Sequence, residues 1–132
     1  GARWGEVAAL EQRRVLHCRI TFSKTKNSKN RTVPISESLF EKIKKRGGKL
    51  VFPTLDYPLV RDVIKTVAPD VPDGQAVHAL RHTFASHFMM NGGNILTLQK
   101  ILGHAKIQTT MIYAHLAPDY LQDAVRFNPI AG

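Results

Sequence analysis

Cysteine is nearly absent from this chain, since Cys18 is its single residue of that type and cannot form a disulfide within the chain. This count excludes the disulfide-stapled secreted scaffolds and favours a reducing compartment. No apolar run approaches the roughly 20 residues that a membrane span needs, and no signal peptide is visible. We therefore expect a soluble protein inside the cell.

Acidic residues are also scarce: 10 Asp and Glu stand against 19 Lys and Arg, which gives a net charge of +9. The hydrophobic share of 43% is that of an ordinary globular protein, so the charge belongs to a folded domain and not to a disordered basic tail. A chain of 132 residues builds one domain with a core. An acidic polymer is the natural partner, but charge does not separate enzymes of nucleic acids from repressors or ribosomal proteins.

The residue patterns that two common kinds of phosphate chemistry require are absent from this sequence. The sequence has no Gly-rich loop ending in Lys-Ser or Lys-Thr, and no clustered carboxylates of the two-metal nuclease kind. His78 and His82 have the i, i+4 spacing of a zinc-protease helix, but Ala79 stands where that motif requires Glu and Arg81 would repel a cation. We expect neither a metal nor a cofactor.

Local patterns predict a mainly helical α+β domain with a small antiparallel sheet at one edge. The β-prone runs are 15–16, 19–23 and 31–35, with a polar turn at 24–30. A helix already in progress near Arg3, without a preceding cap, indicates a fragment. Further helices are expected over 36–43, 58–67, 77–90, 95–102, 109–115 and 118–126.

The helix over 77–90 carries the first polar constellation. At 100° per residue, His78 and Arg81 project within about 60° of each other and can serve one site. Leu80, Phe84 and Phe88 form a separate apolar stripe that we expect in the core.

A second constellation follows a helix end. Gly103 is a typical C-cap, so His104 directly after it lies on a short fixed loop. Thr109 or Thr110 can cap the next helix, which carries Tyr113. Considered alone, a tyrosine such as Tyr113 is more often a half-buried core aromatic than a catalytic residue.

Five segments, in this order, resemble the catalytic domain of the tyrosine recombinases, or phage-type integrases, and several read most like the integrases of P2-like temperate bacteriophages. They are 2–6, 26–35, 78–85, 102–104 and 109–115. The resemblance implies a DNA breaking-rejoining fold over residues 1–132 as an N-terminally truncated fragment, without the DNA-binding arm and core-binding domains that precede it in relatives.

The resemblance assigns the nucleophile to Tyr113, whose hydroxyl would attack a DNA phosphodiester to form a 3′-phosphotyrosyl link. A phenol with a pKa of about 10 needs help to ionise at neutral pH, and His78 is the candidate proton acceptor. Arg3 and Arg81 would hold the charged non-bridging oxygens with guanidinium forks, and His104 would donate a further hydrogen bond.

The family's hairpin lysine, which protonates the departing 5′-oxygen, carries over to Lys26, with Lys24 and Lys29 as near competitors. Glu6 and His82 are expected to orient the reacting side chains without contacting the reacting atoms themselves. The residues expected to contact DNA are Lys24, Lys29 and Arg31.

The function implied is site-specific DNA recombination without ATP, metal or other cofactor. The implied partners are double-stranded attachment sites, a homotetramer on DNA that exchanges C-terminal tails, and accessory DNA-bending proteins. The implied location is the cytoplasm of a bacterial host, at the nucleoid. Two alternatives stay open: a DNA-binding module without cleavage activity, and an enzyme like the type IB topoisomerases.

Overall fold

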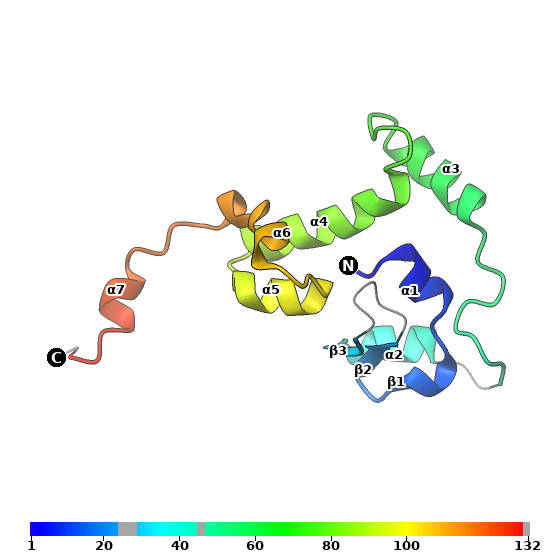
Figure 1. Cartoon of the computed structure of the whole chain (residues 1–132), viewed down its shortest axis with the longest axis horizontal. Helices are drawn as coiled ribbons and strands as arrows, with labels where there is room; N and C mark the ends of the chain where they lie inside the picture. The colour runs from blue at the N-terminus through cyan, green and yellow to red at the C-terminus, as the bar shows by residue number, and fades with distance from the viewer. Residues whose placement is uncertain (24–28, 45–46, 131–132) are drawn as a thin grey trace.

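The computed structural model describes residues 1–23, 29–44 and 47–130, so Lys24 and Lys26 lie outside the described residues. It confirms a mainly helical α+β domain with one small antiparallel sheet. In Figure 1 the sheet lies at one edge, below the N-terminal helix, and the long helix α4 crosses the middle of the molecule. Within the described ranges, every helix is too short or too polar to cross a bilayer.

The N-terminal half is built around the sheet. Strands β1 (Val15–Leu16), β2 (Arg19–Phe22) and β3 (Arg31–Pro34) pair in the order β1-β2-β3, with Ile20 opposite Val33. Helix α1 (Trp4–Ala8), the 3-10 turn η1 (Gln12–Arg14) and α2 (Glu37–Ile43) surround this sheet. Alternation along β2 buries its apolar side chains, which join a first core cluster. That cluster consists of Leu10, Val15, Ile20, Phe22 and Val51.

The C-terminal half is helical. Helix α3 (Tyr57–Val67) packs on α4 (Ala76–Met90), which continues through a glycine turn into α5 (Ile95–Leu102) and α6 (Ile107–Met111). A second core cluster consists of Ala85, Met89, Leu98, Leu102 and Tyr113. The first residues of the chain lie between α1, α4 and α5 (Figure 1).

The face that α4 turns to the core differs from the expected one. Leu80 is 57% exposed and Phe84 37% exposed, whereas Ala85 is fully buried. The small alanine lets α4 approach its neighbours closely. The prediction was therefore wrong for Leu80 and Phe84, whereas Phe88 packs partly buried against the second core cluster.

Two of the expected helices are shorter than predicted. The segment 109–115 divides into the end of α6 and a 3-10 turn, η2 (Ala114–Leu116), with Tyr113 at the junction. Of the segment 118–126, only α7 (Asp123–Arg126) is helical. A short helix needs tertiary packing for stability, and α7 has no buried residue.

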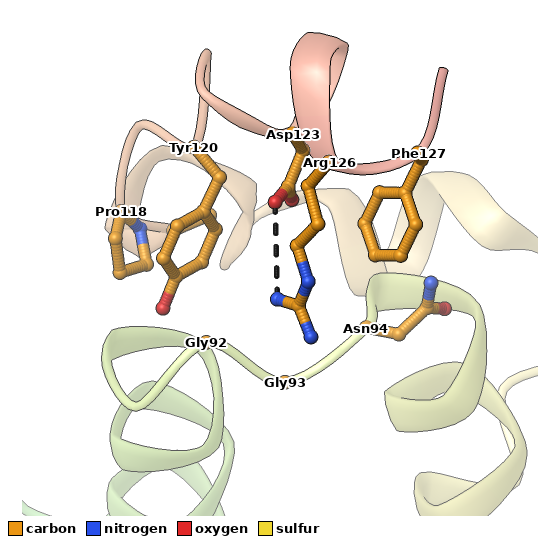
Figure 2. A pocket seen from close by; sticks show the side chains of 9 residues that line it. Gly92, Gly93, Asn94, Pro118, Tyr120, Asp123, Arg126 and Phe127 are labelled. Carbon is orange, nitrogen blue, oxygen red and sulfur yellow. Dashed lines mark ion pairs between the residues drawn. The ribbon is translucent and has the colours of Figure 1, made fainter. Parts of the chain in front are cut away.

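The C-terminal segment leaves the body of the molecule after η2 and ends far from the N-terminus (Figure 1). Its apolar side chains are largely in solvent, with Leu121 77%, Phe127 69% and Ile130 87% exposed. Figure 2 shows Tyr120, Arg126 and Phe127 directed toward the loop between α4 and α5. A cavity of about 520 Å³ separates α7 from that loop, so the contact is loosely packed.

Candidate active site

The first predicted arginine is held at the start of α1. Arg3 is the N-cap of α1, and its backbone N–H donates to Glu6 Oε1 at 2.8 Å. Its side chain extends to the other half of the molecule, where Nη1 donates to the carbonyl of Leu102 at 3.4 Å. Helix α1 therefore connects the sheet half to the C-terminal end of α5.

The second predicted arginine, Arg81 on α4, reaches the same carbonyl. Its Nη2 donates to the Leu102 oxygen at 2.5 Å and its Nη1 to the Gly1 oxygen at 2.6 Å, and the residue is 4% exposed. Burial and the neighbouring Arg3 and Arg31 lower the pKa of Arg81 to about 10, so the guanidinium is still charged at neutral pH. Residues 78 positions apart in the sequence thus place their guanidinium groups on one oxygen.

A third guanidinium completes this group. Arg31 on β3 donates to both carboxylate oxygens of Glu6, through Nη1 and, at 2.9 Å, through Nη2, while its Nε donates to the Ile101 carbonyl at 2.8 Å. Burial raises the pKa of Glu6, but the hydrogen bonds from Arg31 and Arg3 outweigh it and leave that pKa below its usual value. We call Arg3, Glu6, Arg31 and Arg81 the arginine junction.

Arg31 was expected to contact DNA, and the structure shows which protein groups its guanidinium contacts. Its side chain is 11% exposed and bound to protein groups, so a phosphate would have to compete with the Glu6 carboxylate. The fit is close: a Cβ on Gly103 would lie 3.0 Å from Arg31 Cδ, and Gly103 has a φ of +74°. Both observations explain why glycine stands at the end of α5.

His78 opens onto the arginine junction from α4. A small cleft of about 130 Å³ is lined by His78, Arg3 and Arg81, together with Tyr57. Burial lowers the pKa of His78, and the charges of His82 and the two arginines lower it further. The predicted pairing of His78 with Arg81 on one side of α4 is therefore present.

His104 lies on the loop after Gly103, and Thr110 holds its ring. Its Nδ1 is 2.8 Å from the hydroxyl of Thr110, which is fully buried in α6. Burial, and then the charges of Arg81, Arg3 and Arg31, lower the pKa of His104 to about 4. The imidazole is therefore neutral at neutral pH and lies within the electrostatic field of the arginine junction.

Tyr113 lies at the junction of α6 with η2. Its ring belongs to the second core cluster, and the residue is 7% exposed. Its hydroxyl is hydrogen-bonded to Nδ1 of His82, whose ring meets the ring of His78 edge to face at 4.5 Å. Burial raises the pKa of Tyr113, and the charge of Arg81 partly opposes this.

A second cleft, of about 400 Å³, runs from the start of β3 to the loop after α5. Its lining includes Lys29, Lys100 and His104. Lys29 therefore lies at the entrance to the site, whereas the predicted acid Lys26 and its competitor Lys24 lie outside the described residues. The described residues contain no group of three or more His, Cys, Asp or Glu side chains that could hold a metal ion.

Two side-chain partnerships in the site were not predicted from the sequence. Thr110 was considered only as a helix cap, but it lies inside α6 and orients His104. His82 was expected to support the site, but nothing indicated that it contacts Tyr113, 31 residues away. For the pair of His104 and Thr110, the sequence offers only the spacing of six residues between them.

Comparison with known proteins places this geometry in a class. The solved catalytic domain of bacteriophage HP1 integrase is 50% identical and superposes with a TM-score of 0.87, covering 98% of this chain and 76% of that one. The Tn1549 transposon integrase, solved in complex with circular intermediate DNA, is 19% identical with a TM-score of 0.66 over 95% of this chain and 54% of its own, and shares the fold. The fold is that of a tyrosine recombinase catalytic domain.

The phage integrase family model matches residues 1–119, and the chain belongs to that family. The integrase of Escherichia phage P2 is 56% identical over 132 residues, which is all of this chain and 39% of that protein. The chain therefore spans about two fifths of the length of that relative. The resemblance drawn from the five sequence segments is confirmed.

Proposed function

We propose that residues 1–132 act as the catalytic domain of a site-specific DNA recombinase. The observation that carries this proposal is the convergence of Arg3 and Arg81 on the Leu102 carbonyl. The charge of Arg81 also acts on the pKa values of His104 and Tyr113, so both side chains lie within its electrostatic field. Two guanidinium groups that line one cleft, with a neutral imidazole in the neighbouring cleft, suit the extra negative charge of a phosphoryl transition state.

Each side chain has a definite role in this proposal. Tyr113 attacks the phosphorus and forms a 3′-phosphotyrosyl bond, while the 5′-oxygen leaves and takes a proton from Lys26. Arg3 and Arg81 stabilise the non-bridging oxygens. A guanidinium has five N–H donors, so the two carbonyl bonds of Arg81 leave donors for a phosphate.

His104 serves as a donor in its neutral form. If the Thr110 hydroxyl donates to Nδ1, the ring proton is on Nε2, which then donates to the same phosphate oxygens. Glu6 keeps the arginines at a fixed spacing, and His78 lines the cleft beside them. Religation by the 5′-hydroxyl of a second strand then reverses the same steps and releases Tyr113.

Trapping of the covalent intermediate tests this function. Nicked duplexes that span the DNA junctions flanking the gene are incubated with the protein, and covalent adducts are separated on a denaturing gel. Wild type should form an adduct at the 3′ end of the cut, Tyr113→Phe should bind the DNA without forming one, and the exposed Tyr120→Phe should resemble wild type. An adduct that survives in Tyr113→Phe would refute the assignment.

DNA is the proposed partner because of the +9 charge and the lysines along the second cleft. We place the reaction on double-stranded attachment sites in the bacterial cytoplasm, at the nucleoid, with accessory DNA-bending proteins. The Tn1549 integrase was itself solved with DNA.

The exposed C-terminal segment supports a tetramer that exchanges tails. Phe127 and Ile130 are apolar side chains in solvent, and a neighbouring subunit would bury them. Phe127→Ser should leave the unfolding free energy unchanged, because the residue is exposed, but should reduce the tetramer fraction on DNA in sedimentation experiments. An unchanged assembly on DNA would exclude Phe127 from the subunit contact.

A further inference from the structure

Two histidines on α4 lie near the nucleophile, but they occupy different places. His78 lines the cleft with Arg3 and Arg81, while His82 is hydrogen-bonded to the Tyr113 hydroxyl. The His78 ring meets the His82 ring edge to face, with ring centroids 4.5 Å apart. The centroids of His82 and Tyr113 are 5.7 Å apart.

A general base has to reach the proton that it removes. That requirement means a hydrogen bond, directly or through one water, between the base and the nucleophile. His82 satisfies it in this structure through Nδ1, whereas the sequence analysis assigned the task to His78. Burial of the Tyr113 ring also disfavours spontaneous ionisation of its hydroxyl, so the nucleophile depends on a base at this position.

We propose that His82 is the proton acceptor for Tyr113, an inference that rests on the proposed recombinase function. The Tyr113 O–H donates to Nδ1 of a neutral His82 that carries its ring proton on Nε2. As the tyrosine oxygen bonds to phosphorus, its proton moves to Nδ1, and the electron pair of the breaking P–O5′ bond stays on the 5′-oxygen, which Lys26 protonates. Religation returns the proton from His82 to Tyr113.

This assignment divides the work between the two histidines. His82 faces the nucleophile, and His78 faces the arginines and the phosphate. Because His82 and Tyr113 belong to different elements, α4 and the junction of α6 with η2, the hydrogen bond also fixes where the hydroxyl points before DNA binds.

The tautomer of His82 tests the geometry without DNA. Long-range nitrogen–proton correlation NMR spectra distinguish an imidazole protonated on Nε2 from one protonated on Nδ1. We expect the Nε2 form in wild type, and a shift of the Nδ1 signal in Tyr113→Phe. A His82 that carries its proton on Nδ1, or that does not respond to Tyr113→Phe, would overturn the proposal even if the protein is a recombinase.

Cleavage kinetics test the chemistry. His82→Asn keeps an oxygen acceptor near the Nδ1 position but is not basic, and we expect it to slow adduct formation by about 100-fold or more. His87→Asn, an exposed histidine on the same helix, is the matched control and should cleave at the wild-type rate. Imidazole in solution should partly restore His82→Ala. A wild-type rate in His82→Asn would overturn the proposal.

A modified DNA separates His82 from the acid that protonates the leaving group. With sulfur in place of the bridging 5′-oxygen, the leaving thiolate needs no proton, so loss of the leaving-group acid is rescued and loss of the tyrosine base is not. We expect His82→Asn to be equally slow on both substrates, and rescue by sulfur would reassign it as the acid. If wild type forms no Tyr113-dependent adduct, the proposed function fails, and the NMR measurement still decides the hydrogen bond.

Discussion

The arginine side and the tyrosine side of the candidate active site are held by different forces. The three guanidinium groups are fixed by hydrogen bonds to carbonyls and to Glu6, which link residues up to 99 positions apart. Tyr113 is instead held by apolar packing in the helical core and by its hydrogen bond with His82. The guanidinium groups proposed to bind phosphate are therefore fixed by polar contacts between the two halves of the molecule, and the proposed nucleophile is fixed by packing within the helical half.

The comparison extends to electrostatics. In the arginine junction, like charges lie together around one carboxylate, an arrangement that costs folding energy and suits an anionic ligand. At Tyr113, burial opposes charge of any sign. In the proposed reaction, the arginine side of the site would therefore be charged before DNA binds, and the tyrosine side would become charged only as Tyr113 attacks.

Removal of the carboxylate of Glu6 is expected to have the largest effect on stability. In Glu6→Gln the buried guanidinium groups lose their counter-charge, and the free energy of unfolding should fall by roughly 3–5 kcal/mol in urea titrations. Glu11→Gln, which breaks the exposed pair with Arg13, is the control and should show no measurable change. Equal effects in the two variants would contradict the special role of the junction.

Thr110 links the two sides through His104, and its loss should have a smaller effect on the reaction. Thr110→Val keeps the shape of the side chain but removes the hydroxyl that fixes the imidazole, so cleavage should slow about tenfold, equivalent to about 1.4 kcal/mol. The exposed neighbour variant Thr109→Val should cleave normally in the same gel assay. If Thr110→Val retains full activity, the orientation of His104 does not depend on this hydrogen bond.

The smallest expected effect is a change in the pH dependence of stability. In the unfolded chain His104 has the ordinary pKa of 6.5, whereas in the folded protein its pKa is lowered to about 4. Between these pH values the unfolded state binds more protons than the folded state, so the unfolding free energy should fall as the pH drops through that window. His78, whose pKa is also lowered, contributes in the same direction. Urea titrations between these pH values should show a flatter dependence in His104→Gln, and an unchanged slope would place the effect elsewhere.

Local sequence signals predicted much of the site. The helix over 77–90 carries His78 and Arg81 on one side because its period is that of any α-helix, and Gly103 ends α5 because only glycine readily adopts its left-handed conformation. The ion pair of Arg31 with Glu6 was not predicted, because it joins β3 to α1 and depends on how α1 packs beside the sheet. The length of α7 was also wrong, since the missing packing that shortens it is a tertiary property.

The amino-acid sequence by itself determined the family, the order of the reactive residue types and the helices and strands that carry them, because these depend on neighbours along the chain. Only the tertiary structure decided that Arg31 neutralises Glu6, that Thr110 holds His104 and that His82 meets Tyr113. These pairs are separated along the chain or do not follow helical spacing, and packing within each half of the molecule brings them into contact.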